Sequence, residues 1–267
     1  MNNWQAFDLH EGNSPLLISM PHSGTCLTAE VAQGMTPAAK ALPDTDWHIP
    51  ELYKLAPSLG ASIVSANYSR YVIDLNRPEN NAALYTSKTT GLFPEILFTD
   101  EPLFQVGKTP SADHRETCKQ QVWQPYHHAI TQQLERIKQQ HGYAILLDAH
   151  SISGQVPMLF SGDLPHFNWG TNAGNSCAES ILQVAQNSVN EGMYTQVSNG
   201  RFKGGYITRH YGQPQQGVHA IQLELSQDTY LQDSYKQDGN YVLSPEKLDT
   251  VTLVLNKLLK GLIAWCP

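Results

Sequence analysis

Several features are missing from this sequence, and each absence narrows what the protein can be. No apolar stretch approaches the roughly 20 residues needed to cross a membrane. Positive charge is scarce, and the formal net charge of −7 disfavours a nucleic-acid or acidic-membrane partner. The four cysteines are widely scattered and form no CxxC pair, so they predict neither a disulfide framework nor a cysteine-ligated metal.

Common functional signatures are missing too. The first eight residues have no basic segment followed by an apolar one, which predicts no signal peptide and hence a cytoplasmic protein with reduced thiols. Neither a GxxxxGK[ST] phosphate loop nor a GxSxG nucleophile elbow occurs. Ser23 and Ser151 each follow a histidine, but adjacent residues on a strand point to opposite faces, which disfavours a Ser–His dyad.

What is present is the patterning of an ordinary globular chain, with 40% apolar and 15% charged residues. No repeat, low-complexity tract or linker is visible, so we predict one domain covering residues 1–267. Strand patterns alternate with helix patterns, which predicts an α/β fold with a central, largely parallel sheet between helical layers. The expected strands are 16–20, 61–66, 71–75, 144–147 and 220–223. The expected helices are 47–59, 121–140, 173–189 and one that starts at 245 behind a Ser cap, whereas 80–111 has no clear period.

The ends of three predicted strands carry side chains with chemical potential. The first strand runs into His22, the 144–147 strand runs into His150, and the 220–223 strand runs into Glu224. In an open α/β sheet the ligand crevice lies beyond the carboxyl ends of the strands, so these side chains are expected to meet there. Two imidazoles and a nearby carboxylate are the components of a catalytic zinc site.

The acidic residues near this predicted site each allow two interpretations. Asp46 is either the N-cap of a helix or the third metal ligand, and Asp44 is close enough in sequence to replace it. Asp148 either ends its strand or orients His150 from behind. Glu224 stands between two leucines in a strand pattern, where a carboxylate is costly unless it serves a site or a salt bridge.

Arginines gather in two stretches. Arg70 and Arg77 flank a predicted strand, and Arg201 and Arg209 lie in a glycine-containing stretch that ends at His210. These stretches are either solvated hairpins that carry basic residues or carboxylate-binding loops. The second interpretation is possible because the guanidinium group offers a planar bidentate fork.

At this point the sequence resembles a known family, the N-formylglutamate amidohydrolases, over nearly the whole chain. The resemblance rests on Pro-His-Ser-Gly at 21–24, Asp-Thr-Asp-Trp at 44–47, the stretch 69–78, Trp-Gln-Pro-Tyr-His at 123–127, Asp-Ala-His-Ser-Ile at 148–152, the segments 164–165, 168 and 170–172, the long match through 199–212, and the segment 219–224. The family is similar to zinc carboxypeptidases and aspartoacylases. The resemblance therefore implies a three-layer α/β/α fold with a central mixed, largely parallel sheet.

The resemblance also implies roles for individual residues. Zinc would be held by His22, Asp46 and His150, with Asp46 preferred over Asp44. Glu224 would be the general base and Arg70 would polarise the scissile carbonyl. The expected substrate-binding residues are Asn76, Arg77, Arg201, Arg209 and His210. These roles predict the zinc-dependent hydrolysis of N-formyl-L-glutamate, a small anionic N-acyl amino acid, to formate and L-glutamate, as in histidine degradation.

One departure from the family pattern keeps other functions open. Related deformylases tend to carry arginines where this chain has Ser153 and Met158. The alternatives are a zinc acylase or carboxypeptidase-like hydrolase for another small N-acyl amino acid, and a non-enzymatic carboxylate-binding module. A metal assay combined with a panel of N-acyl amino acids distinguishes the three functions.

Overall fold

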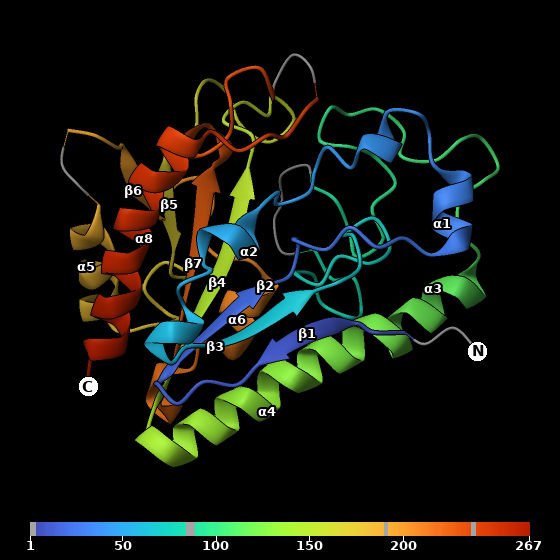
Figure 1. Ribbon diagram of the computed structural model, residues 1–267. Coiled ribbons are helices and arrows are strands. Elements are labelled where there is room, and N and C mark those ends of the chain that lie inside the picture. The colour runs from blue at the N-terminus through green and yellow to red at the C-terminus, as the bar shows by residue number, and fades with distance from the viewer. Residues whose placement is uncertain (1–3, 84–88, 190–191, 236–238) are drawn as a thin grey trace.

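The computed structural model describes residues 4–83, 89–189, 192–235 and 239–267, and its centre is a mixed seven-stranded sheet with the order β1-β3-β2-β4-β7-β5-β6. Figure 1 shows this sheet between two groups of helices, as the predicted three-layer α/β architecture requires. The strands are β1 Phe7–His10, β2 Leu16–Met20, β3 Ser62–Ala66, β4 Ala144–Ile152, β5 Phe167–Gly170, β6 Gln196–Ser198 and β7 Val218–Ser226. The central strands β3, β2, β4 and β7 are parallel, whereas β1 and β5 run antiparallel to their neighbours β3 and β7.

The α-helices are α1 Ala29–Gly34, α2 Ile49–Leu52, α3 Ala112–Cys118, α4 Gln124–His141, α5 Glu179–Ser188, α6 Tyr206–Tyr211 and α8 Pro245–Ala264. Short 3-10 turns lie at η1 Ala39–Ala41, η2 Pro57–Leu59, η4 Pro214–Gln216 and η5 Gln227–Thr229, and the π-turn η3 Lys119–Trp123 joins α3 to α4. Within the described residues, no helix combines the length and the apolar character needed to cross a membrane.

The alternation of side chains along the central strands creates two separate cores. On β4, Leu146 packs into the core shared with α4 and α6, whereas Ile145 and Leu147 pack into the core shared with α2, α5 and α8. All three side chains are fully buried. Because neighbouring strand residues point to opposite faces, a sheet that is covered on both sides needs a continuous apolar run, and β4 supplies one.

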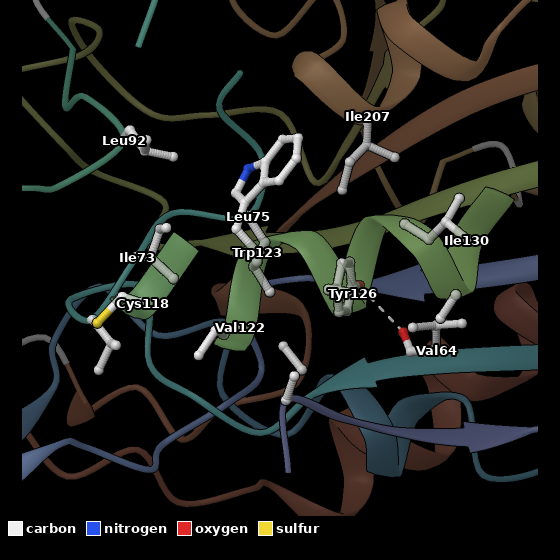
Figure 2. Close-up of a cluster of buried hydrophobic side chains, with 14 of the residues drawn as sticks. Val64, Ile73, Leu75, Leu92, Cys118, Val122, Trp123, Tyr126, Ile130 and Ile207 are labelled. Atoms are coloured by element: carbon white, nitrogen blue, oxygen red, sulfur yellow. Dashed lines mark hydrogen bonds between the residues drawn. The ribbon is translucent and has the colours of Figure 1, made fainter. Parts of the chain in front are cut away.

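Figure 2 shows the first of these cores, where α4 and the π-turn before it cover one end of the sheet. Tyr126 from α4 lies fully buried over β3, and its hydroxyl donates a hydrogen bond to the Val64 carbonyl oxygen at 3.3 Å. Trp123 packs beside it, and its indole N–H donates to the Arg77 carbonyl oxygen at 2.9 Å. This hydrogen bond connects the backbone at Arg77 to the start of α4. The helix ends at His141, and Gly142 caps it with a left-handed φ of 83°.

The predicted strand 71–75 is wrong. This segment forms turns, in which the Val72 amide donates to the Ser69 carbonyl oxygen at 2.8 Å and the Asp74 amide donates to the Leu92 carbonyl oxygen at 2.8 Å. Its apolar side chains are nevertheless buried in the α4-side core. The apolar run therefore reflects burial in this core, which also contains residues of α3, of the π-turn before α4 and of the irregular 80–111 segment. The described part of 80–111, which leaves out residues 84–88, forms no helix or strand.

Two predicted helices are shorter than expected. The 47–59 pattern contains only α2, which starts after the left-handed His48 and ends at Leu52, and the turn η2, which starts at Pro57. The 173–189 pattern becomes helical only at Glu179, since Asn172 and Ala173 adopt left-handed backbone angles. By contrast, α8 begins at Pro245 as predicted and buries Val251, Leu255, Leu258, Leu259 and Leu262, although Ser244 makes no capping hydrogen bond through its side chain.

Candidate active site

The parallel strands bring the predicted chemical residues to one edge of the sheet. His22 lies two residues after the end of β2. His150 and Glu224 lie near the carboxyl ends of β4 and β7, because both strands extend further than expected. His150 and Glu224 are direct partners in the β4–β7 register, so their side chains lie on the same face. The same register pairs Asp148 with Gln222, which places four polar residues together on the face that packs against α6.

A potential metal-binding group forms at the centre of this edge. One ligand atom from each of His22, Asp46 and His150 lies within 4.8 Å of the other two, and all three residues are buried. Asp46 Oδ2 is 3.0 Å from His150 Nδ1 and 3.8 Å from His22 Nδ1. The two imidazole rings are 4.8 Å apart between centroids. Two neutral-type nitrogen donors and one carboxylate fit the ligand preferences of zinc.

The far nitrogen of His22 is held by a carboxylate. Asp74 Oδ1 lies 2.7 Å from His22 Nε2, and Asp74 Oδ2 accepts a 2.9 Å hydrogen bond from Arg70. Burial alone would raise the pKa of Asp74, but His22 and Arg70 hold it well below its usual range. A carboxylate behind a histidine fixes the ring and its tautomer, as metal-binding histidines require. Arg70 also donates to the Asp44 carbonyl oxygen at 3.3 Å.

The far nitrogen of His150 has two partners. His150 Nε2 lies 3.1 Å from Asp148 Oδ1 and 2.9 Å from Asn76 Nδ2. Although burial lowers the pKa of His150, the Asp148 and Asp46 carboxylates outweigh it and raise the pKa well above its usual range. Positive charge is therefore stabilised at this position, which suits a bound cation. Asp148 thus acts on His150 from behind, which is one of the two interpretations that its sequence position allowed.

The structure separates the roles of the two neighbouring aspartates. Asp46 is not a helix N-cap, because α2 starts after His48 and the Asp46 carboxylate instead accepts a hydrogen bond from the Ser151 amide at 3.1 Å. The Asp44 carboxylate accepts a hydrogen bond from the Phe98 amide at 3.1 Å. Burial raises the pKa of Asp44 to about 6. The ligand group among the described residues contains Asp46 and not Asp44.

Glu224 is buried at the same edge and lines the pocket beside the two histidines. Burial raises its pKa to about 8, against the opposing effect of His150. The amide nitrogen of Gln222 donates to Glu224 Oε2 at 3.2 Å, and the Gly205 amide donates to Gln222 Oε1 at 2.7 Å. Gln222 therefore fixes the Glu224 carboxyl to the loop before α6. A carboxyl group with a pKa near neutrality is matched to proton transfer.

The pocket around these groups has a volume of about 60 Å³ and is rich in guanidinium groups. Arg70, Arg77 and Arg201 line it together with Asn76. Arg77 donates from Nε to the Thr90 carbonyl oxygen at 2.9 Å, which ties the irregular segment to the site. Arg70 lies 4.8 Å from the centre of the Phe98 ring, in cation–π contact.

Not every predicted substrate-binding residue lines this pocket. Arg209 donates to the Gly204 carbonyl oxygen at 2.8 Å, and His210 is exposed and stacks on Tyr206 at 4.9 Å. Neither belongs to the pocket lining. The 199–212 stretch forms a loop followed by α6, so a solvated hairpin is excluded. Gly205 is required there, because a Cβ atom on it would lie 2.4 Å from Asn76 Nδ2.

Sequence reasoning missed two residues that the structure brings into the site. The sequence pattern predicts a strand around Asp74 and assigns no role in the site to Gln222. The signal for Gln222 was available, because it lies two residues before Glu224 and strand residues two apart share a face. Asp74 gave no comparable signal, since its contact with His22 joins residues 52 positions apart through a turn.

Comparison with known proteins agrees with this geometry. The sequence profile of the family described as N-formylglutamate amidohydrolase matches residues 14–231. The chain is 48% identical over 266 residues to an N-formylglutamate deformylase of Pseudomonas putida, covering 98% of this chain and 97% of the relative. It is 49% identical over 263 residues to an N-formylglutamate deformylase of Pseudomonas aeruginosa, with the same coverage of both chains.

Solved structures share the fold. An N-formylglutamate amidohydrolase from Ralstonia eutropha superimposes with a TM-score of 0.79 at 24% identity, over 96% of this chain and 97% of that chain. A gene product of Agrobacterium tumefaciens gives a TM-score of 0.68 at 15% identity, over 97% of this chain and 95% of that chain. The profile covers most of the sequence, and both deformylases match it almost from end to end, so the chain belongs to the N-formylglutamate amidohydrolase family.

Proposed function

We propose that this protein hydrolyses N-formyl-L-glutamate to formate and L-glutamate and that it uses zinc to do so. The family and the names of its two Pseudomonas relatives support the hydrolase activity and the substrate. The observation that carries the proposal is the convergence of three potential metal ligands, a buried Glu224 and several arginines on one edge of the sheet. We also propose the relation to zinc carboxypeptidases and aspartoacylases that the resemblance of the sequence implies.

The residues that would hold the metal are His22, Asp46 and His150. Zinc bound there supplies Lewis acidity, which polarises a carbonyl group and lowers the pKa of water. The donor set fits this ion because the rear nitrogen of each histidine faces a carboxylate, Asp74 in one case and Asp148 in the other.

Glu224 is the proposed general base. Its carboxylate takes a proton from the attacking water and later delivers it to the leaving amine, so the amide C–N bond breaks as the acyl carbon gains the oxygen of water. The hydrogen bond from Gln222 fixes one carboxyl oxygen, which leaves the other available for this transfer.

Arginines supply the charge that an anionic substrate needs in a protein of net charge −7. Arg70 is the proposed partner of the developing oxyanion. Arg77 and Arg201 are the proposed partners of the glutamate carboxylates, and both line the pocket. Asn76 lines it as well, and its amide also holds His150. The substrate-binding roles of Asn76, Arg209 and His210 stay predictions.

Metal content and substrate preference test the proposal together. Protein that has never met a chelator should carry one zinc per chain, lose activity on chelation and regain it with zinc. Asp46→Asn should lose the metal, and the matched control Asp44→Asn should keep it. Absence of a stoichiometric divalent ion would overturn the zinc site, and the reverse result for the two variants would reassign the acidic ligand.

The substrate assay uses N-formyl-glutamate beside N-formyl-glutamine and neutral N-formyl amino acids. We expect N-formyl-glutamate to be strongly preferred. Equal cleavage of the neutral compounds would replace the deformylase assignment by a broader zinc acylase. Metal binding without any hydrolysis would leave a carboxylate-binding module.

A further inference from the structure

A second, larger cavity adjoins the catalytic pocket. Its volume is about 340 Å³, within the roughly 300–1,000 Å³ range of ordinary ligand pockets. The two cavities share Phe98, Ser151 and Ile152 as lining residues. Ser151 follows the proposed ligand His150 directly, and Thr45 precedes Asp46. The large cavity is therefore lined by sequence neighbours of two proposed ligands, and we call it the acyl chamber for the role argued below.

The charges of the two cavities differ sharply. Three arginines line the catalytic pocket, whereas the described lining of the acyl chamber contains neither lysine nor arginine. The acidic side chain there is Asp44, and the described lining offers no basic side chain that could pair with a carboxylate of a ligand. A second carboxylate would be disfavoured in such surroundings. Apolar walls from Ile152, Val156 and Tyr241 instead suit an uncharged group.

The position of the scissile amide decides which part of a substrate reaches this chamber. Under the proposed function, the glutamate carboxylates would be held on the arginine side, and the amide carbonyl would lie at the metal-binding group beside Glu224. The remaining substituent of that carbonyl is the acyl group, which points away from the arginines. A formyl group places only a hydrogen atom there, so it uses almost none of the chamber.

We propose that this chamber is an acyl subsite and that the enzyme binds and hydrolyses N-acyl-glutamates whose acyl group is a short neutral chain rather than formyl alone. This inference rests on the proposed function, because the arginines must first hold the glutamate part. The reaction is the same hydrolysis. The C–N bond breaks, the oxygen of water joins the acyl carbon, and the amine gains a proton, which gives a short carboxylic acid and glutamate.

A homologous series of compounds tests the proposal. N-acetyl-, N-propionyl- and N-butyryl-glutamate are measured as substrates and as competitive inhibitors of N-formyl-glutamate hydrolysis by the zinc-loaded enzyme. Each methylene group that enters an apolar chamber should lower Ki about fourfold. N-succinyl-glutamate, which has a similar length but an anionic end, should bind more weakly than the butyryl compound. Ki values that stay constant or rise along the series would overturn the proposal.

A filled chamber provides the matched variant. Ser153 lines the acyl chamber and not the catalytic pocket, so Ser153→Trp should remove the gain in affinity with chain length. Met193→Trp, at a residue that is 54% exposed and outside both linings, should keep the gain. If Ser153→Trp fails to fold, Ser153→Leu should weaken the gain in the same direction. An undiminished gain in a folded Ser153 variant would contradict the assignment of the chamber.

The same experiment separates the two proposals. An enzyme that does not hydrolyse N-formyl-glutamate fails the proposed function. An enzyme that hydrolyses it but binds the longer acyl compounds no better fails only the acyl subsite.

Discussion

The two ends of one sheet face differ in the kind of side chain that they carry. On the face towards α4 and α6, β4 carries Ala144 and Leu146 at its beginning and then Asp148 and His150. On β7, Ala220 is followed by Gln222 and then by Glu224 in the same way. The alternation of faces continues without a break, but the residue type changes from aliphatic to ionisable. One backbone thus builds a core at one end and a reaction centre at the other.

The energetics of the two ends are opposite. Complete burial of an aliphatic side chain stabilises the fold by about 1.5–3 kcal/mol, whereas a buried ionisable group costs free energy unless it is paired. At the polar end each group is held by another: Asp74 by His22 and Arg70, and Glu224 by Gln222. This comparison predicts that substitutions at the apolar end change stability and that substitutions at the polar end change activity.

The largest expected effect is that of Glu224→Gln on turnover. Removal of the base should lower kcat by roughly two to four orders of magnitude. The amide preserves the size of the side chain, so zinc content should be unchanged, and the free energy of unfolding should be equal or higher because a buried carboxyl group is gone. Steady-state kinetics, metal analysis and denaturant unfolding measure the three quantities. An unchanged kcat would make Glu224 a structural residue.

Leu146→Ala tests the apolar end of the same face. Loss of a fully buried leucine should lower the free energy of unfolding by about 2–5 kcal/mol. The kcat per folded molecule should stay at the parental value, since Leu146 is not part of the site lining given above. Urea unfolding followed by kinetics on the folded fraction checks both. A large loss of kcat with intact stability would show that the two ends are not separable.

Arg77→Ala tests which substrate group the positive charge at the polar end recognises. Loss of charged hydrogen bonds to a substrate carboxylate should cost about 1.5–3 kcal/mol, which corresponds to a roughly 10- to 100-fold lower kcat/KM for N-formyl-glutamate. Arg77→Lys should recover only part of the lost kcat/KM, because lysine lacks the forked guanidinium group that also donates to Thr90. The selectivity against N-formyl-glutamine should fall in parallel. Retained selectivity would assign the carboxylate to another residue.

The smallest expected effect, counted per pH unit, concerns acid stability. His127 is buried between the Leu75 carbonyl oxygen and the Tyr211 hydroxyl, and burial lowers its pKa from 6.5 to about 3. A lowered pKa means that the unfolded chain binds the proton first, so stability is lost as pH falls from about 6.5 towards 3, by up to about 1.4 kcal/mol per pH unit. His127→Gln should unfold with a shallower pH dependence than the parent. Identical slopes would contradict the neutral buried histidine.

Much of this arrangement could be predicted from the sequence because the apolar runs of the strands lead directly to the site residues. The apolar runs before His22, His150 and Glu224 located the edge of the sheet, and the parallel order followed from the alternation of strands and helices. The strand pattern alone could not identify the third ligand, because Asp46 contacts His150 across 104 residues and its position fits a helix cap equally well. The resemblance to a family, rather than periodicity, favoured Asp46.

The other features of the site could not be predicted, because a local sequence pattern does not show which distant segments pack against it. The segment around Asp74 is apolar enough for a strand, yet it is buried by a loop and pairs with no neighbouring strand. Arg209 and His210 share a sequence stretch with Arg201, but only Arg201 turns into the pocket, because α6 starts at Tyr206 and directs the later residues elsewhere. The acyl chamber has walls from five separate segments and no motif of its own.

The order of the strands also governs how the chain must be assembled. β4 lies between β2 and β7, and β7 is the last strand to be synthesised. Until Val218–Ser226 has left the ribosome, one whole edge of β4 stays without its neighbour, and that edge belongs to a strand that is buried along all nine residues. An unpaired apolar edge is a template for wrong pairing. The interval between the synthesis of β4 and that of β7 is therefore the one in which wrong pairing of this edge is expected.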